Sequence, residues 1–465
     1  MTKLLKSILA ATLAFSLVAC SNTASNEPTP AEEEKEEEVV EEETAAEEEA
    51  AEEETAAEEE VDTTPTKGEY VIYNSTGEDV TELYIFENGG SDNGENYVET
   101  VGWTDGVMTV SKEDVPANEA HGRYTLKFVT AGGYEGVFET LSQEEAPIAL
   151  ISKDDSDAMT GGTQISFSVP VYFTVTYAAA HGNKCFSTAA VAVTKDGTIV
   201  DAYLDEYQYM AADGNTGVPN SDADADGAFA TYFNEGQVLG SKKVNHEAYS
   251  AHMAEAAGAT TDLRVSYEAI EDFVKGKNIS ELEGGVDEVT GSTLADTPGY
   301  VALIVDTAKA ALEGKAYYGA VAPQALEIVE ADYAAHGDKC FTFVANLMSG
   351  DKVIATYIDE FQYMAADTAG IVPVPNGDDL EGFGGNNKEG YVLISKKVNN
   401  DIYSANMADH AGATQEILVS YNAIEDFVAN TKLEDLDGVD AVTGSTLVDT
   451  AGYVSAVVNA ANSPK

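Results

Sequence analysis

Two short segments of this chain place a threonine hydroxyl where a phosphate ester could form. Each segment reads Asp, two further residues and Thr-Gly-Ser-Thr, and a predicted helix follows; they are Asp287–Thr293 and Asp440–Thr446. Glycine lets a backbone approach a ligand closely, and a helix N-terminus presents N–H groups and a positive dipole end to an anion. The same letters also form an ordinary turn and cap, so physical chemistry alone leaves both interpretations open.

The elements that must position these hydroxyls occur twice, because the chain contains a tandem repeat. Ala-His-Gly-Asn-Lys-Cys185 recurs as Ala-His-Gly-Asp-Lys-Cys340. Residues 241–274 align without a gap with residues 395–428, and 23 of these 34 positions are identical. This period is far too long for a solenoid, so we expect each copy to own a hydrophobic core.

Within each copy the pattern predicts an α+β fold. In the first copy, residues 191–204 alternate in polarity around a Lys-Asp-Gly turn, which predicts a β-hairpin. Helical periodicity over residues 267–274 predicts a helix that the following glycine ends. A last helix is predicted over residues 296–314, because an aspartate cap and a proline precede an apolar stripe.

Residues 68–169 lie outside the repeat and predict a small all-β, sandwich-like antiparallel domain. Its β-rich runs, separated by Gly, Asn and Asp turns, are Val71–Tyr73, Leu83–Phe86, Tyr124–Val129, Val137–Thr140 and Gln164–Val169. We find no chemistry in this segment and interpret it as a spacer.

Composition excludes several classes of function. Among 465 residues, 24 Lys+Arg against 83 Asp+Glu give a net charge of -59, so phosphate backbones and anionic headgroups are poor partners. We therefore expect no nucleic acid partner. The chain has three cysteines and no CxxC, which excludes a disulfide scaffold, a thioredoxin-like pair and an attached c-type haem. Cys185 and Cys340 are predicted to be buried thiols.

The metal signals are weak, and we expect no metal site. The histidines show no metal-ligand spacing. Residues 222–227 imitate the start of a calcium loop, but position twelve is Phe233 instead of glutamate, and the second copy lacks the pattern.

The N-terminus resembles a bacterial lipoprotein leader. Lys3 and Lys6 precede an apolar stretch over residues 8–18 that is too short to span a membrane, and Leu-Val-Ala-Cys20 follows. This lipobox implies cleavage before Cys20, a lipid on its sulfur, and attachment to the extracytoplasmic face of the cell membrane through that lipid. Residues 31–62 hold 19 acidic residues against one lysine, which predicts an extended linker.

The chain is thus predicted to have five parts. They are a lipoprotein signal peptide at 1–19, a lipid-anchored acidic disordered linker at 20–67, a β-rich spacer domain at 68–169, and repeat domains at 170–315 and 325–465.

The segment that ends each copy resembles the FMN-binding domain family, whose pattern is Asp-x-x-[Ser/Thr]-Gly-Ala-Thr before a helix. That family includes the covalent-FMN subunits of the sodium-pumping quinone reductase and of the Rnf complex. In it a flavin transferase, using FAD and magnesium, esterifies the last threonine with FMN phosphate. The resemblance implies covalent FMN on Thr293 and Thr446. It also implies a recognition motif of Asp287, Thr290, Gly291 and Ser292, with Asp440, Thr443, Gly444 and Ser445, where serine replaces the family's alanine.

Residues 170–465 with the leader also resemble the two-flavin lipoproteins of Listeria-type extracellular electron transfer. This resemblance implies electrons that arrive from a membrane quinone-linked donor and leave through flavin to extracellular acceptors such as ferric iron or soluble shuttles. We expect an electron carrier with no catalytic residues of its own, because the cofactor performs the chemistry.

Two further sets of side chains are candidates for contact with a flavin. The set for packing against the ring is Tyr207, Tyr209 and Met210, with Phe361, Tyr363 and Met364. The set for the phosphate or the ring edge is Lys242, Lys243 and Asn245, with Lys396, Lys397 and Asn399. The lysines could equally be salt-bridged at a strand end.

Three alternatives stay open. A third Asp-x-x-Thr-Gly-x-Thr, at Asp157–Thr163, makes Thr163 a hypothetical third flavin site. A solute-binding lipoprotein would share the anchor but would need one cleft between interleaved lobes. A surface stalk or adhesin would use Thr-Gly-Ser-Thr only as a turn.

Overall fold

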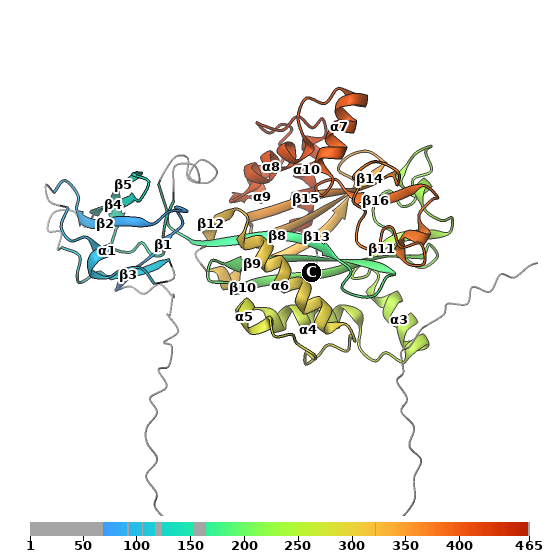
Figure 1. Cartoon of the computed structure of the whole chain (residues 1–465), viewed down its shortest axis with the longest axis horizontal. Coiled ribbons are helices and arrows are strands. Elements are labelled where there is room, and N and C mark those ends of the chain that lie inside the picture. The colour runs from blue at the N-terminus through green and yellow to red at the C-terminus, as the bar shows by residue number, and fades with distance from the viewer. Residues whose placement is uncertain are drawn as a thin grey trace, which may run out of the picture. The chain divides into compact units, whose positions relative to one another are not determined.

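The computed structural model describes residues 68–90, 93–104, 106–116, 123–151, 164–320 and 322–463. The predicted leader, Cys20, the acidic linker and the motif at Asp157–Thr163 lie outside these residues. The fold class is mixed α+β with several antiparallel sheets, as predicted (Figure 1). None of the helices in these ranges is long and apolar enough to cross a membrane.

Two small sheets make up the N-terminal β-rich segment. The strands of the first are β1 (Glu69–Asn74), β3 (Val107–Ser111), β6 (Ile148–Leu150) and β7 (Ile165–Ser166). Those of the second are β2 (Val80–Glu87), β4 (Arg123–Thr130) and β5 (Glu135–Ser142), and one short helix is α1 (Tyr97–Thr100). A hydrophobic core containing Ile72, Leu126 and Phe128 draws on both sheets, as a sandwich requires. The prediction of purely antiparallel pairing is wrong, because β1 pairs with β6 in parallel.

The first repeat forms a five-stranded antiparallel sheet in the order β11-β10-β9-β8-β12. Its strands are β8 (Val169–Ala178), β9 (Cys185–Thr194), β10 (Ile199–Ala211), β11 (Gln237–Ser241) and β12 (Ala316–Ala320). Its helices are α3 (His246–Ala257), α4 (Leu263–Val274), α5 (Ile279–Leu282) and α6 (Thr297–Leu312), and one 3-10 turn is Phe229–Tyr232. The β9–β10 pair is the predicted hairpin.

The second repeat has the strand order β13-β14-β15-β16, and short β17 pairs with β15. The strands are β13 (Glu327–Tyr333), β14 (Cys340–Ser349), β15 (Lys352–Ala365), β16 (Tyr391–Ser395) and β17 (Thr431–Lys432). The helices are α7 (Asn400–Ala411), α8 (Ile417–Val428), α9 (Leu433–Leu436) and α10 (Thr450–Ala461), and 3-10 turns lie at Pro323–Ala325 and Phe383–Asn386.

The helices begin and end where local chemistry predicts. In α4 the Asp262 side chain accepts a hydrogen bond from the N–H of Arg264, and Tyr267, Ile270 and Val274 are buried along one face. Helix α6 starts after Asp296 with proline in its first turn, as the sequence predicts. Both helices pack on the outer face of the first sheet, in one core with Val191 and Leu204.

The inner faces of the two repeat sheets pack against each other. One core contains Tyr203, Tyr207 and Tyr209 from the first repeat together with Phe341 and Phe361 from the second. Figure 1 shows α4 and α6 beside the first sheet and α8 and α10 beside the second, so the sheets lie between the helical layers. The expectation that each copy owns its core therefore holds only for the helical side of each sheet.

Reciprocal hydrogen bonds also join the repeats. The Asn220 side chain donates to the carbonyls of Gly337 and Cys340 at 2.9 and 2.7 Å. The Asn376 side chain donates to the carbonyls of Gly182 and Cys185 at 2.9 and 2.8 Å. Because each asparagine satisfies two backbone carbonyls of the other copy, the strand that carries one buried cysteine depends on the other repeat. We call these two asparagines the clasp.

Candidate functional site

The two predicted acceptor threonines lie on exposed turns of matching geometry. Thr293 and Thr446 are both exposed. The preceding Gly291 and Gly444 have φ angles of 98° and 95°, in the left-handed region that glycine tolerates without strain. A Cβ on either glycine would lie 3.1 Å from an alanine Cβ on the neighbouring helix. These glycines are therefore required both by conformation and by close packing.

A buried serine holds each acceptor turn against a helix. The N–H of Thr293 donates to Ser266 Oγ at 3.4 Å, and the N–H of Thr446 donates to Ser420 Oγ at 3.2 Å. Both serines lie in the first half of their helices, α4 and α8. The turn therefore has a defined position from which the threonine side chain extends.

The serine that departs from the family pattern has a local role. Ser292 Oγ accepts a hydrogen bond from the N–H of Leu294 at 3.4 Å, and Ser445 Oγ accepts one from the N–H of Leu447 at 3.3 Å. The hydroxyl thus stabilises the turn just after the acceptor, as serine commonly does.

The expected free N–H groups at the start of α6 are not present. The N–H groups of Thr297, Gly299 and Tyr300 donate to carbonyls of the preceding turn at 2.9 to 3.3 Å, and Pro298 has none. An anion on Thr293 would therefore be held by other groups.

A cavity of about 430 Å³ lies beside Thr293. We call it the threonine cavity. Its apolar walls include Tyr249, Met253 and Tyr300. Its polar lining includes His181, Glu206, Lys242, Thr260 and Thr261. The volume and the mixture of apolar wall and few polar groups are those of small-molecule sites in proteins.

A buried ion pair lines this cavity. Lys242 Nζ lies 2.6 Å from Glu206 Oε2, and both side chains are 1% exposed. Burial alone would lower the pKa of Lys242, but the carboxylate of Glu206 raises it above its ordinary range. Burial alone would raise the pKa of Glu206, but Lys242 lowers it. Both groups are therefore charged, and the ammonium is a fixed positive charge at the cavity.

Further groups complete the network around Glu206. Tyr267 Oη and Ser187 Oγ each donate to it at 2.8 Å, which offsets the desolvation of its charge. Cys185 is a free, buried thiol, as predicted, and burial raises its pKa to about 12. It therefore stays protonated and unreactive.

The second repeat has the same network. Lys396 Nζ lies 2.6 Å from Glu360 Oε2, and Tyr421 Oη donates to that oxygen at 3.0 Å. The ammonium lies 4.6 Å from the ring centroid of Tyr403, as that of Lys242 lies 4.9 Å from Tyr249. The sequence suggested the two lysines, whereas Glu206 and Glu360 were missed, although each lies three residues before the repeated Tyr-Met pair.

The remaining predicted contacts are not among the residues that line the threonine cavity. Tyr209 and Tyr363 lie in the core between the sheets, where their hydroxyls are hydrogen-bonded to each other. Lys243 and Lys397 form ion pairs with Glu271 and Glu425 at 2.7 and 2.6 Å, as the salt-bridge interpretation expects. The other contacts predicted in the first copy, Tyr207, Met210 and Asn245, also lie outside that lining. In the second copy, Phe361 lies in the core between the sheets, Met364 packs against the helical core, and the Asn399 side chain donates to the carbonyls of Val372 and Ser395.

The outer part of each motif is exposed. Asp287, Thr290, Asp440 and Thr443 are all exposed and lie on the surface of their turns.

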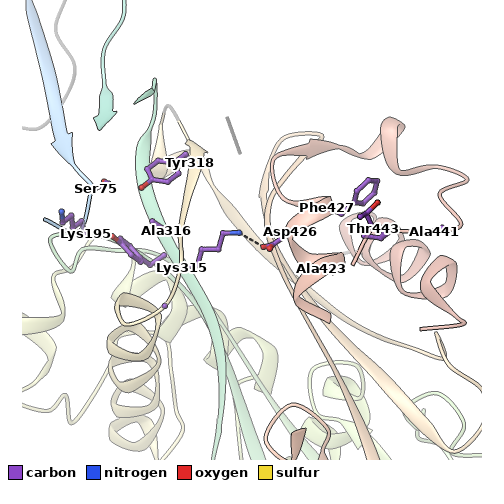
Figure 2. Close-up of a pocket in the computed structure, with 14 residues that line it drawn as sticks. Ser75, Lys195, Lys315, Ala316, Tyr318, Ala423, Asp426, Phe427, Ala441 and Thr443 are labelled. Carbon is purple, nitrogen blue, oxygen red and sulfur yellow. Dashed lines mark hydrogen bonds and ion pairs between the residues drawn. The ribbon is translucent and has the colours of Figure 1, made fainter. Parts of the chain in front are cut away.

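Thr443 borders a separate cavity of about 1000 Å³, which Lys315, Tyr318 and Phe427 also line (Figure 2). Lys315 reaches towards Asp426 there, with 2.5 Å between Nζ and Oδ1. Thr446 is not among the residues that line this cavity.

Two histidines at equivalent positions of the repeats contact the caps of the last helices. His181 Nδ1 lies 2.5 Å from Asp296 Oδ2, and His336 Nδ1 lies 2.6 Å from Asp449 Oδ2.

Within the described ranges, no group of three or more His, Cys, Asp or Glu side chains could hold a metal ion, and this includes the acidic residues 222–226.

Comparisons of the chain with models of known families, with curated proteins and with solved structures find no match.

Proposed function

We propose that this chain is an extracytoplasmic, lipid-anchored flavoprotein that carries FMN as a phosphoester on Thr293 and on Thr446. It relays electrons from the membrane quinone pool to extracellular acceptors such as ferric iron or soluble shuttles. In this proposal the two repeats are FMN-binding domains, and the N-terminal β-rich segment is a spacer. The observation that carries the proposal is an exposed threonine on the wall of a cavity that also contains a buried ammonium group.

The residues beside Thr293 fit an esterified flavin nucleotide. An ester at this hydroxyl keeps the rest of the ligand next to the threonine cavity, whose volume of about 430 Å³ suits a molecule of that class. Tyr249, Met253 and Tyr300 offer apolar surface to a planar ring. The hydroxyls of Thr260 and Thr261 offer hydrogen bonds to polar edges.

Bound FMN would supply one- and two-electron transfer, and the chain's own residues would set its environment. Lys242 places a positive charge at a site with little access to water, where electrostatic interactions are strong. Glu206 keeps that charge in place. Because the two charges are opposite and 2.6 Å apart, the pair presents a polar but net-neutral surface to the group that fills the cavity. The repeated ion pair of Lys396 and Glu360 supports the same role in the second copy.

The test is flavin stoichiometry after co-expression with a flavin transferase that uses FAD and magnesium. Intact mass should show two added FMN groups on the parent chain, one on Thr293→Ala, one on Thr446→Ala and none on the double variant. In-gel flavin fluorescence after denaturing electrophoresis should follow the same series, since only a covalent flavin survives.

Two variants serve as controls. Thr293→Ser retains a hydroxyl and should keep part of the labelling at that site. Thr260→Ala removes a hydroxyl from the same cavity and should leave the mass increment unchanged. Unchanged stoichiometry in the Thr→Ala variants, or a colourless parent chain, would reject the assignment. A third FMN on the parent chain, or a single FMN on the double variant, would instead direct attention to Thr163.

A further inference from the structure

A cavity of about 540 Å³ lies where the two repeats meet, separate from both acceptor threonines. We call it the inter-repeat cavity. The first repeat contributes β10 and the segments that follow it, and the second contributes β13. The residues that matter here are Tyr203, Asp205, Tyr207, Glu330, Asp332 and Tyr333.

Three carboxylates line this cavity without a cationic partner. In the described part of the chain, none of Asp205, Glu330 and Asp332 takes part in an ion pair. Each nearby cation already has a carboxylate of its own. These pairs are Lys243 with Glu271 at 2.7 Å, His246 with Asp262 at 2.9 Å, and Arg264 with Glu268 at 2.8 Å.

Glu330 is the least satisfied of the three. It is 8% exposed, and its Oε2 is buried without a hydrogen-bond partner. Asp205, in contrast, accepts hydrogen bonds from Ser241 Oγ and from the N–H of Lys243, and Asp332 accepts one from Tyr207 Oη at 2.9 Å. A buried polar atom without a partner is unfavourable, so Glu330 indicates that a ligand belongs in the cavity.

The duplication provides an internal control for this inference. In the second repeat, Glu330 pairs with Ala345 of β14, and Asp332 pairs with Phe343. In the first repeat, the β9 residues that correspond to these two pair with Val175 and Tyr177 of β8. Tyr177 of the first repeat is therefore the residue equivalent to Asp332 of the second repeat, and both lie where the repeats meet. It packs edge-on against Phe361 at 5.2 Å and donates to Asp359 Oδ2 at 2.9 Å.

The repeats thus differ at two equivalent positions, where the first has Val175 and Tyr177 and the second has Glu330 and Asp332. A large buried side chain contributes stability, whereas a buried carboxyl group without a partner reduces it, so packing alone does not account for the two acids. The difference therefore favours a ligand site over a packing defect.

The titration of the acids is consistent with a missing cation. Burial raises the pKa of Glu330 well above its ordinary value, the carboxylates of Asp205 and Asp332 raise it further, and Lys243 lowers it. Burial likewise raises the pKa of Asp332. Burial thus disfavours the charged form of these carboxyl groups, and a bound cation would favour it.

We propose that the inter-repeat cavity binds a small organic cation with primary ammonium groups, held by Glu330 and Asp332 and flanked by tyrosine rings. A metal ion is disfavoured, because within the described ranges no three His, Cys, Asp or Glu side chains, these three carboxylates included, are placed so that they could hold one. An ammonium can donate to both carboxylates, and its methylene groups can lie against Tyr203, Tyr207 and Tyr333. A volume of about 540 Å³ accommodates such a molecule.

The experiment is calorimetric titration of the full chain with 1,4-diaminobutane and, separately, with 1,5-diaminopentane. The test variant Glu330→Val/Asp332→Tyr copies the equivalent position of the other repeat. The matched control Asp222→Asn/Asp224→Asn removes the same charge from exposed residues. We expect binding to the parent and the control, and about tenfold or greater weakening in the test variant, with proton release that depends on the buffer.

Equal affinity in all three proteins would show only general attraction to an acidic chain and would overturn the proposal. Absence of binding to the parent would also overturn it. If the double variant does not fold, Glu330→Gln supplies the comparison, because it has nearly the same shape and should weaken binding of the diamine. Preference for Mn²⁺ or Ca²⁺ over both diamines in the same titration would contradict an organic ligand.

Discussion

The two repeats have matching geometry around a buried ion pair, whereas one pair of equivalent positions at their junction differs. Lys242 and Glu206 in the first copy, and Lys396 and Glu360 in the second, have the same separation of 2.6 Å and the same tyrosine donor. At the junction, Tyr177 occupies one of two equivalent positions and Asp332 the other.

This difference separates two kinds of constraint. The first ion pair borders the same cavity as Thr293, and the ion pair of the second copy has the same separation. The junction exists only in the pair of repeats, and its two positions can therefore acquire separate roles. We infer that the copies keep a common site chemistry, whereas the space between them has become specialised.

The largest expected effect comes from removing one partner of the repeated ion pair. Lys242→Met and Lys396→Met should each lower the free energy of unfolding by about 3–5 kcal/mol, because an uncompensated carboxylate stays buried. Chemical denaturation followed by circular dichroism measures this. The double variant Lys242→Met/Glu206→Gln should recover part of the loss.

The exposed pair of Lys309 and Glu283 provides the control for this prediction. Lys309→Met should have a much smaller effect, since solvent screens surface pairs. Losses at Lys242 and Lys396 that differ widely would show that the copies are energetically unlike despite their matched geometry.

A smaller effect is expected on the pH dependence of stability. Burial raises the pKa of Asp205 to about 6, against the hydrogen bonds from Ser241 and Lys243 that lower it. The folded state therefore holds a proton that the unfolded state releases near pH 4. Stability from this group is fully present below that pH and is lost as the pH rises towards about 6, by roughly 3 kcal/mol at most.

Asp205→Asn should remove this component and flatten the dependence between about pH 4 and 6, measured by urea denaturation at each pH. Asn can keep the geometry, since its carbonyl can accept the same backbone hydrogen bonds. Asp359→Asn is the matched variant of the second repeat, where burial also raises the pKa of the carboxyl. An unchanged slope in Asp205→Asn would refute the assignment.

The smallest effect is expected at the clasp. Asn220→Gly and Asn376→Gly each remove the hydrogen bonds to two carbonyls of the other repeat. Glycine tolerates the left-handed backbone of these positions, where φ is 68° and 62° in the parent. Each should lower the free energy of unfolding by about 1–2 kcal/mol, and the two losses should be similar.

Asn430→Gly controls for the backbone change, because Asn430 has a φ of 61° and its Oδ1 has no hydrogen-bond partner. The control should be close to neutral in the same denaturation measurement. If Asn430→Gly lowered the free energy of unfolding as much as Asn376→Gly does, the effect at the clasp would come from backbone entropy alone.

Local sequence was enough to predict much of the fold. The alternation over residues 191–204 predicts the β9–β10 hairpin, and the capped apolar stripe from Asp296 predicts α6. These signals are local, because side-chain periodicity and capping act over a few residues. The parallel β1–β6 pair joins strands more than 70 residues apart, and no local pattern specifies it.

The candidate site was predicted in part. Thr293 lies beside a cavity, and Lys242 borders it, whereas Tyr209 and Lys243 are engaged elsewhere. Neighbouring residues such as Lys242 and Lys243 can extend to opposite sides of the chain. Which of the two reaches the cavity depends on the packing of α3 and α4, so sequence alone could not separate them.

The sequence by itself determined the duplication, the acidic character, the repeated Thr-Gly-Ser-Thr and the helix and strand signals, since all of these are properties of composition or short-range order. Only the tertiary structure decided that the two sheets share a core, that Glu206 and Glu360 meet the lysines, and that Glu330 and Asp332 face a cavity. The physical reason is that these contacts join strands far apart along the chain. Their geometry follows from the packing of whole sheets, which the pattern of one strand does not specify.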